Sequence, residues 1–172
     1  MIIGKNFFIT EMPKTGTSFL RNYFKTYKNI IITKHHDTVE HNKNLKLLKK
    51  KYRISTMRSP YTWYLSFWKW SCLQKKQSPL YNDLISRRIK IRRLKLNSKL
   101  FSYLFNQITK NTNKLESLFI DVNSKKNFNK FLQILLNHRY RNYISSDYSF
   151  TQYNELGYMS HFFFYQNVLR KY

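Results

Sequence analysis

The stretch FFITEMPKTGTSFL, Phe7–Leu20, passes from a short apolar run through a turn of small and hydroxyl residues into a helix-like pattern. Its first part, Phe7–Thr10, is aromatic and β-branched and predicts a buried strand. Apolar residues then recur at helical spacing at Phe19, Leu20, Tyr23, Phe24 and Tyr27. The turn Pro13–Ser18 is therefore predicted to join a strand to the N-terminus of a helix.

This turn has the composition of an anion-binding loop. A helix N-terminus presents free backbone N–H groups and the positive end of the helix dipole. Gly16 allows the backbone to approach a ligand closely, and Lys14 adds a full positive charge. Thr15, Thr17 and Ser18 offer hydroxyl groups. Together these features predict a phosphate or sulfate site, and the alternative is an ordinary helix start with a chance lysine.

The loop is not of the ATP-binding type. That type requires G-x-x-x-x-G-K-[ST], with the lysine directly after the second glycine. Here Lys14 precedes Gly16 by two positions, and Glu11 stands where the first glycine would be. A P-loop kinase also needs a magnesium-binding aspartate after a strand, and none is evident.

Strand-like and helix-like segments alternate outward from this loop. The expected strands are Phe7–Thr10, Asn29–Lys34 and Arg53–Met57, and the expected helices begin at Thr17, at Asp37 or Thr38 (reaching about Lys51), and at Pro60 (reaching Trp70). This order predicts an α/β, P-loop-like three-layer fold, with a central parallel sheet and helices on both faces.

The second half of the chain is less regular. Leu73–Pro79 is expected to be a loop, and Arg87–Lys99 is a basic block that fits neither period. Helices are expected at Phe128–Leu136 and at roughly Glu155–Arg170. No repeat or linker is evident, so residues 1–172 are expected to form one domain. Within it, residues 1–72 form the regular α/β part and residues 73–172 a mostly helical part.

Composition narrows the function classes. Of 172 residues 42% are hydrophobic, and 32 Lys and Arg face 8 Asp and Glu, for a net charge of +24. The positive electrostatic field of such a chain attracts polyanions, although coding biased toward A and T would also add lysines.

The sequence also bears on disulfides, metals and membranes. Cys72 is the only cysteine, which excludes a disulfide framework. His35, His36 and His41 lack a carboxylate-rich cluster, so no metal is expected. Neither a membrane span nor a secretory signal is evident, and a cytoplasmic location is expected.

A second constellation lies in RSPYTWYLS, Arg58–Ser66. Arg58 falls just past a predicted strand, at the edge where open α/β sheets bind ligands. Pro60 is suited to begin a helix, and Ser66 lies two turns into it. An arginine fork is a suitable clamp for a phosphate group.

The two constellations together resemble the PAPS-dependent sulfotransferase family, with P-K-T-G-T-[ST] after one strand and R-x-P followed by a serine after another. PAPS is 3′-phosphoadenosine 5′-phosphosulfate. The resemblance covers about Phe7–Trp70 and makes residues 1–72 the PAPS-binding core and residues 73–172 the acceptor side. It assigns Lys14, Thr15, Gly16, Thr17 and Ser18 to the 5′-phosphosulfate, and Arg58 and Ser66 to the 3′-phosphate.

The segment KHHDTVEH, Lys34–His41, extends the resemblance. It looks like the H-x-T-[AV]-x-E pattern of carbohydrate-type sulfotransferases, which places His36 as the catalytic base. Imidazole titrates near neutral pH and suits removal of the acceptor proton. Neighbouring His35 remains an alternative base, and Glu40 is either a second acidic group or a solvated side chain.

The sequence thus predicts sulfuryl transfer from PAPS to a hydroxyl or amine, on a carbohydrate that can itself be anionic, leaving PAP (adenosine 3′,5′-bisphosphate). The resemblance implies catalytic roles for Lys14 and His36 and needs no metal. Two alternatives remain open. One is a nucleic-acid-binding module that uses the +24 charge, although nothing in the motifs requires nucleic acid. The other is a degenerate fragment that binds PAP without turnover.

Overall fold

The structure, a computed structural model, describes residues 1–34, 48, 50–87, 98–149, 157–160 and 163. It is a mixed α/β structure that forms two compact units, dividing between Trp63 and Tyr64. This division falls inside helix α3 (Pro60–Leu73), whereas the sequence places it after residue 72. The organisation as one domain remains a prediction, and the two units are described separately.

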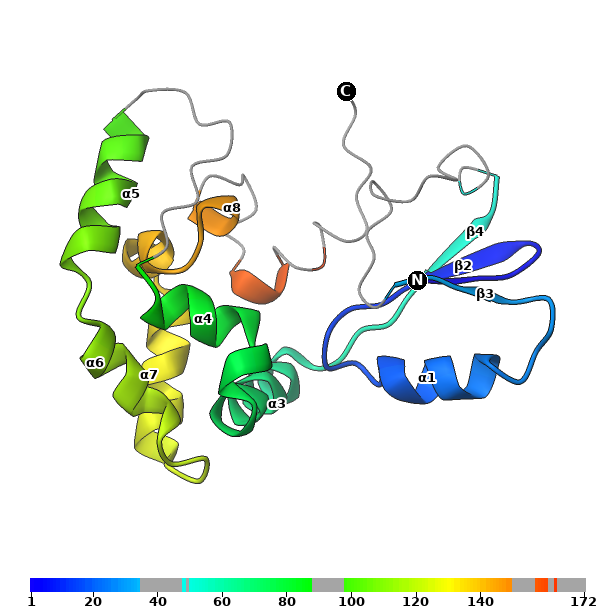
Figure 1. Cartoon of the computed structure of the whole chain (residues 1–172), viewed down its shortest axis with the longest axis horizontal. Coiled ribbons are helices and arrows are strands. Elements are labelled where there is room, and N and C mark those ends of the chain that lie inside the picture. Colours follow the sequence, from blue (N-terminus) through cyan, green and yellow to red (C-terminus); the bar gives the residue numbers. More distant parts are fainter. Residues whose placement is uncertain (35–47, 49, 88–97, 150–156, 161–162, 164–172) are drawn as a thin grey trace. The chain divides into compact units, whose positions relative to one another are not determined.

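The first unit contains a four-stranded sheet in the order β3-β1-β2-β4 (Figure 1). The strands are β1 (Ile2–Ile3), β2 (Phe7–Thr10), β3 (Ile31–Ile32) and β4 (Tyr52–Ser55). β2 and β4 are parallel, with Phe7 opposite Tyr52 and Thr10 opposite Ser55. β1 is antiparallel to both β2 and β3. The three predicted strands therefore run in one direction.

The prediction of a purely parallel sheet is wrong, because β1 lies between β3 and β2 and makes the sheet mixed. β1 is two residues long, too short for its pattern to be recognised in the sequence. A tight hairpin joins it to β2, in which the Gly4 N–H donates to the Phe7 carbonyl at 2.9 Å. A Cβ atom on Gly4 would lie 2.5 Å from the Phe7 ring, so a larger residue here would require that ring to shift.

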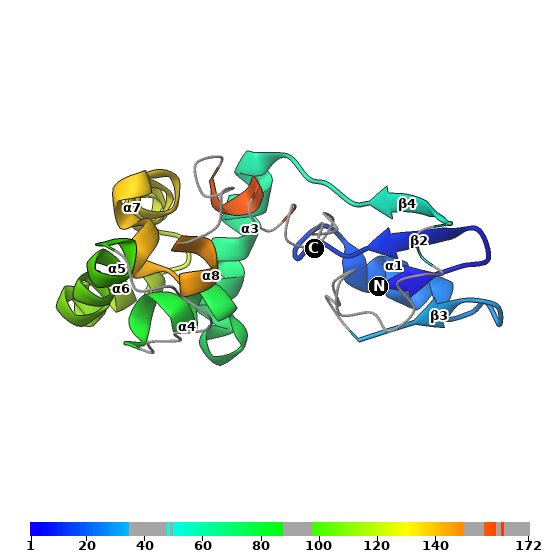
Figure 2. The same ribbon diagram turned by 90° about the horizontal axis from the view of Figure 1, so that it is seen from above.

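Helix α1 (Thr17–Phe24) lies along one face of this sheet (Figures 1 and 2). The Phe24 ring packs against Phe7, with ring centroids 6.0 Å apart. A small apolar core forms at Met1, Ile3, Phe8 and Leu48. The described residues include no helix assigned to the opposite face, so the three-layer arrangement remains a prediction. Most of the helix expected up to Lys51 lies outside the described residues.

The second unit, Tyr64–His161, is helical in its described part. After α3 it contains η1 (Lys75–Gln77), α4 (Pro79–Ile85), α5 (Ser98–Thr109), α6 (Thr112–Glu116), η2 (Ser117–Phe119), α7 (Lys125–Leu136), η3 (His138–Tyr143) and α8 (Ser146–Ser149). The predicted helix Phe128–Leu136 is confirmed as the greater part of α7. Side chains of Ser78, Asn111 and Ser124 cap α4, α6 and α7 by accepting from backbone N–H groups.

Aromatic packing stabilises this unit. The Trp68 ring lies 5.3 Å from Phe128, and Phe119 lies 5.1 Å from Tyr81 and 5.9 Å from Phe131. Lys110 is also buried in this unit, and its ammonium group donates to the backbone carbonyls of Asp83 at 2.9 Å and Tyr143 at 3.3 Å.

Several predictions for the second half change or stay open. The expected loop Leu73–Pro79 contains η1 and the first residue of α4. Most of the basic block Arg87–Lys99 lies outside the described residues, and α5 begins at Ser98. The helix expected at Glu155–Arg170 also lies largely outside them. Among the described helices, none has the length and apolar character to cross a membrane.

Candidate anion-binding site

The turn between β2 and α1 has an unusual backbone. Lys14 has φ 65° and Gly16 has φ 83°, both in the left-handed region. Glycine adopts this region at little cost, whereas for lysine it is uncommon and marks a locally constrained loop. Gly16 is the N-cap of α1 and supplies no side-chain hydrogen bond to the helix. The first-turn N–H groups of α1 therefore have neither an intrahelical acceptor nor a side-chain cap, as an anion site requires.

The three hydroxyl residues of the loop differ in their surroundings. Thr15 Oγ1 donates to the Met12 carbonyl at 2.7 Å and lies 2.6 Å from Thr56 Oγ1. Because the single Thr15 proton is used by Met12, Thr56 is the donor in the second bond. Thr17 is buried, whereas Ser18 is exposed. In this arrangement Ser18 is the loop hydroxyl open to an anion, and Thr15 holds the loop together.

Residues that follow β4 anchor the loop. The indole N–H of buried Trp63 donates to the Pro13 carbonyl at 2.7 Å. The Arg58 guanidinium contacts the Lys14 carbonyl at 3.4 Å and donates to Thr62 Oγ1 at 3.1 Å. Since β2 and β4 are parallel neighbours, Lys14 and Arg58 both follow the carboxyl ends of their strands at one edge of the sheet. The sequence predicted this edge for Arg58, and for Lys14 a turn between a strand and a helix.

The two cations influence each other. Burial lowers the pKa of Lys14, and the positive charge of Arg58 lowers it further. The effect of Arg58 on this pKa means that the positive charges of Lys14 and Arg58 are close enough to repel each other. An anion bound between them would remove this repulsion, which makes the edge a suitable position for a phosphate or sulfate group.

Glu11 places a carboxylate close in sequence to the anion-binding loop, and its charge is neutralised by neighbouring cations. Its Oε1 and Oε2 each accept a hydrogen bond from Arg21 at 2.6 Å, and Oε2 also accepts from the Met1 amino group at 2.5 Å. Burial alone would raise the pKa of Glu11, but the hydrogen bonds from Arg21 and Met1 outweigh burial and lower it. Both carboxylate oxygens are therefore engaged with cations other than Lys14. Glu11 ties the end of β2 to α1 and does not act as a loop ligand.

Sequence reasoning missed Thr56, Trp63 and the structural role of Glu11. The one available signal was a glutamate at the end of an apolar run, because a buried carboxylate demands a cationic partner. A hydrogen bond from an indole nitrogen to a proline carbonyl has no sequence pattern.

Three predicted site residues are not placed with this loop. Ser66 is half-buried on α3 in the second compact unit, and its part in holding the same ligand as Arg58 remains a prediction. His36 lies outside the described residues, as does its alternative His35. Within the part of the chain that the structure describes, no group of three or more His, Cys, Asp or Glu could hold a metal ion.

Comparison of the chain with protein-family models, with curated proteins and with solved structures finds no match. A functional assignment therefore rests on the loop geometry, its two cations and the motifs of the sequence.

The anchoring role of Trp63 can be tested against Trp68 on the same helix. Both side chains are buried, but the Trp68 indole N–H has no hydrogen-bond partner among the described groups. Trp63→Phe should lower the free energy of unfolding by about 1–3 kcal/mol more than Trp68→Phe, because only the first leaves a buried carbonyl unpaired. Urea denaturation of both variants measures the difference. Equal losses would show that the indole hydrogen bond does not hold the loop.

Proposed function

We propose that the protein binds PAPS at the loop after β2 and transfers its sulfuryl group to a hydroxyl or amine, with a carbohydrate as the acceptor class. The observation that carries the proposal is the convergence of Lys14 and Arg58 at the carboxyl edge of the parallel pair β2 and β4. Two cations beside an uncapped helix N-terminus support binding of an anion with more than one charged group. The order of the motifs, which resembles that of PAPS-dependent sulfotransferases, makes PAPS the proposed anion.

In this proposal, different residues bind the two ends of PAPS and stabilise the leaving group. The first-turn N–H groups of α1 and the exposed Ser18 hydroxyl hold the 5′-phosphosulfate. Arg58, with Ser66 assigned by resemblance, holds the 3′-phosphate. The acceptor oxygen or nitrogen forms a bond to sulfur while the bond between sulfur and the bridging phosphate oxygen breaks. Lys14 neutralises the charge that develops on this leaving oxygen, which is an electrostatic contribution.

The acceptor proton must leave as the new bond forms. The resemblance assigns this proton to His36, since a neutral imidazole accepts it near physiological pH. The products are the sulfated acceptor and PAP.

Incubation with PAPS labelled in its sulfate group tests the proposal. We expect the label to appear on at least one member of a panel of glycans and lipids, and His36→Ala to abolish the transfer. His35→Ala is the matched control, because loss of transfer in that variant alone would make His35 the base. PAP binding without transfer to any acceptor would favour the fragment that binds without turnover.

Nucleic-acid binding is the second candidate, favoured by an exposed aromatic row that runs along α1 and continues just past its end. Phe19, Tyr23 and Tyr27 are 72%, 52% and 49% exposed, and successive rings lie 6.5 and 5.5 Å apart. Bases of single strands stack on such rings, and binding to phosphates weakens steeply with salt. Weak binding of single-stranded RNA and DNA even at low salt would dismiss this candidate.

A further inference from the structure

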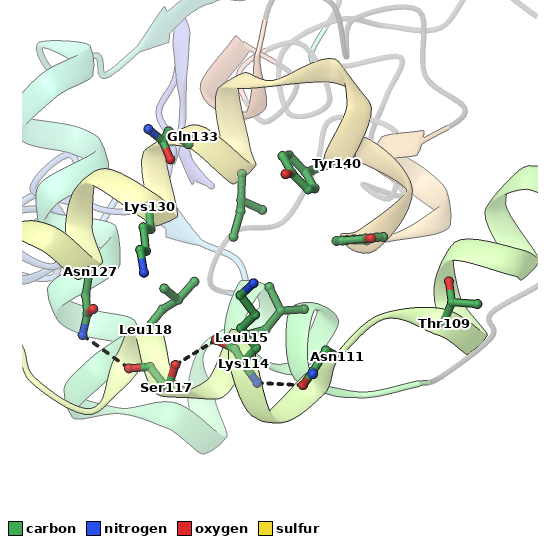
Figure 3. A pocket seen from close by; sticks show the side chains of 12 residues that line it. Thr109, Asn111, Lys114, Leu115, Ser117, Leu118, Asn127, Lys130, Gln133 and Tyr140 are labelled. Atoms are coloured by element: carbon green, nitrogen blue, oxygen red, sulfur yellow. Dashed lines mark hydrogen bonds between the residues drawn. The ribbon is translucent and has the colours of Figure 1, made fainter.

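The second unit contains a cavity of about 490 Å³, formed by α6, η2, α7 and η3 with the end of α5 (Figure 3). Its volume falls in the range of about 300–1,000 Å³ that is typical of small-molecule sites. All residues that line it belong to this unit, so it is separate from the loop after β2. None of the residues to which the proposed function assigns a role lines it.

Two exposed lysines give the cavity its charge. Lys114 comes from α6 and Lys130 from α7, and both line it (Figure 3). None of the described residues that line it is an Asp or a Glu. The nearby Glu116 carboxylate accepts a hydrogen bond from Tyr81 at 2.8 Å. Among the described residues, neither lysine has a salt-bridge partner, so both ammonium groups remain available to an anion.

Aromatic and aliphatic side chains form the rest of the wall. The rings of Tyr140 and Tyr143 lie 5.5 Å apart at 57° to each other. Buried Leu115 and Leu118 add an apolar surface. Because the two rings are tilted and adjacent, they offer separate faces and no parallel slot for a flat base. The C–H groups of a sugar ring pack on such faces, where the aromatic quadrupole is negative.

Side-chain amides complete the polar lining. Asn127 uses one N–H to donate to the Ser117 carbonyl at 3.3 Å, which leaves its amide oxygen and second N–H for a ligand (Figure 3). Gln133 lines the same cavity and is exposed. Paired donors and acceptors of this kind match vicinal hydroxyl groups.

We propose that this cavity binds a saccharide unit that carries a sulfate or carboxylate group. The anionic group lies between the ammonium groups of Lys114 and Lys130, the sugar ring packs on Tyr140 and Tyr143, and the hydroxyls pair with the amides. The two lysines provide the selectivity for an anionic sugar over a neutral one.

Calorimetric titration of the full chain with a sulfated uronic acid–hexosamine disaccharide tests this assignment. We expect saturable binding that weakens at least about tenfold in the Lys114→Gln/Lys130→Gln variant, since hydrogen bonds to charged groups are the strong ones. Lys126→Gln, at an exposed α7 position that does not line the cavity, should change the affinity less than about twofold. Tyr140→Phe should retain binding and Tyr140→Ala should weaken it, because the contact uses the ring face.

The remaining arms decide the ligand class. Lactose, a neutral disaccharide, should bind at least about tenfold more weakly than the sulfated one, because it has no group for the lysines. Equal binding of inorganic sulfate would reduce the site to a simple anion site, and tighter binding of adenosine 5′-monophosphate would make it a nucleotide site; either overturns the proposal. The proposal would also be overturned if the sulfated disaccharide did not bind, or if Lys126→Gln lost as much affinity as the double variant.

The Lys14→Ala variant separates this site from the PAPS site. It should leave disaccharide binding unchanged, so the two proposals can fail independently of each other.

Discussion

Glu11→Gln should lower the free energy of unfolding by about 3–5 kcal/mol, the usual cost of breaking a buried ion pair from one side. The Glu11 side chain is fully buried, and that of Arg21 is only 12% exposed. The substitution preserves shape but removes the charge that accepts both Arg21 hydrogen bonds. Arg21 also donates to the Thr33 carbonyl at 2.9 Å, so the loss would loosen the connection among β2, α1 and β3.

Chemical denaturation at neutral pH measures this loss. Glu116→Gln is the matched control, because Glu116 is exposed and its contact with Tyr81 survives as a neutral hydrogen bond. If Glu11→Gln does not fold, Arg21→Lys provides the measurement, since it keeps the charge and removes the paired geometry. A loss no larger than that of Glu116→Gln would contradict the structural role of Glu11.

The same ion pair predicts a pH dependence. The pKa of Glu11 is lowered from its ordinary value of 4.5, so the folded state favours the ionised form. Its contribution to stability is therefore complete above the unfolded pKa and declines as the pH falls through the lowered folded pKa. The difference in stability between the natural protein and Glu11→Gln should shrink with acidification. A difference that grows below pH 4.5 would contradict the assignment.

Lys14→Ala should reduce sulfuryl transfer from PAPS by about 10²-fold or more, the usual effect of removing a group that stabilises developing charge. Its position in the loop, with its carbonyl contacted by Arg58, supports a role at the leaving phosphate oxygen. The side chain is half-buried and has no place in the apolar core, so the fold should survive.

Transfer from labelled PAPS under single-turnover conditions separates this chemical effect from binding. Lys25→Ala is the matched control, because it also removes one positive charge, and Lys25 is exposed at the opposite end of α1. Unchanged transfer in Lys14→Ala, or an equal loss in Lys25→Ala, would remove Lys14 from this role.

The elements closest to the anion loop could be predicted from the sequence because their patterns are local. β2 occupies the predicted Phe7–Thr10, and α1 begins at the predicted Thr17. β4 and β3 differ from their predicted ranges at the ends, where pairing with a neighbour decides which residues belong to a strand. β1 could not be predicted, since its two residues become a strand only by pairing on both sides.

The contacts that hold the site depend on tertiary structure. Trp63 and Pro13 are 50 residues apart in the sequence, and Thr15 and Thr56 are 41 apart. Neither pair follows from composition or spacing. In the second unit, α4 and α6 are short and depend on the caps Ser78 and Asn111 together with packing. Lys114 and Lys130 could not be separated from the other basic residues until α6 and α7 brought them to one cavity.

The central claim is that the Lys14 and Arg58 edge binds a nucleotide with phosphate groups at both the 3′ and 5′ positions. Thermal unfolding with PAP and, separately, with ATP at equal concentration tests it most directly, because at a fixed concentration the ligand that binds the folded state more tightly raises the melting temperature more. We expect PAP to raise the melting temperature clearly and ATP to raise it much less, with the PAP effect lost in Arg58→Ala. Equal stabilisation by both nucleotides, or by neither, would contradict the claim.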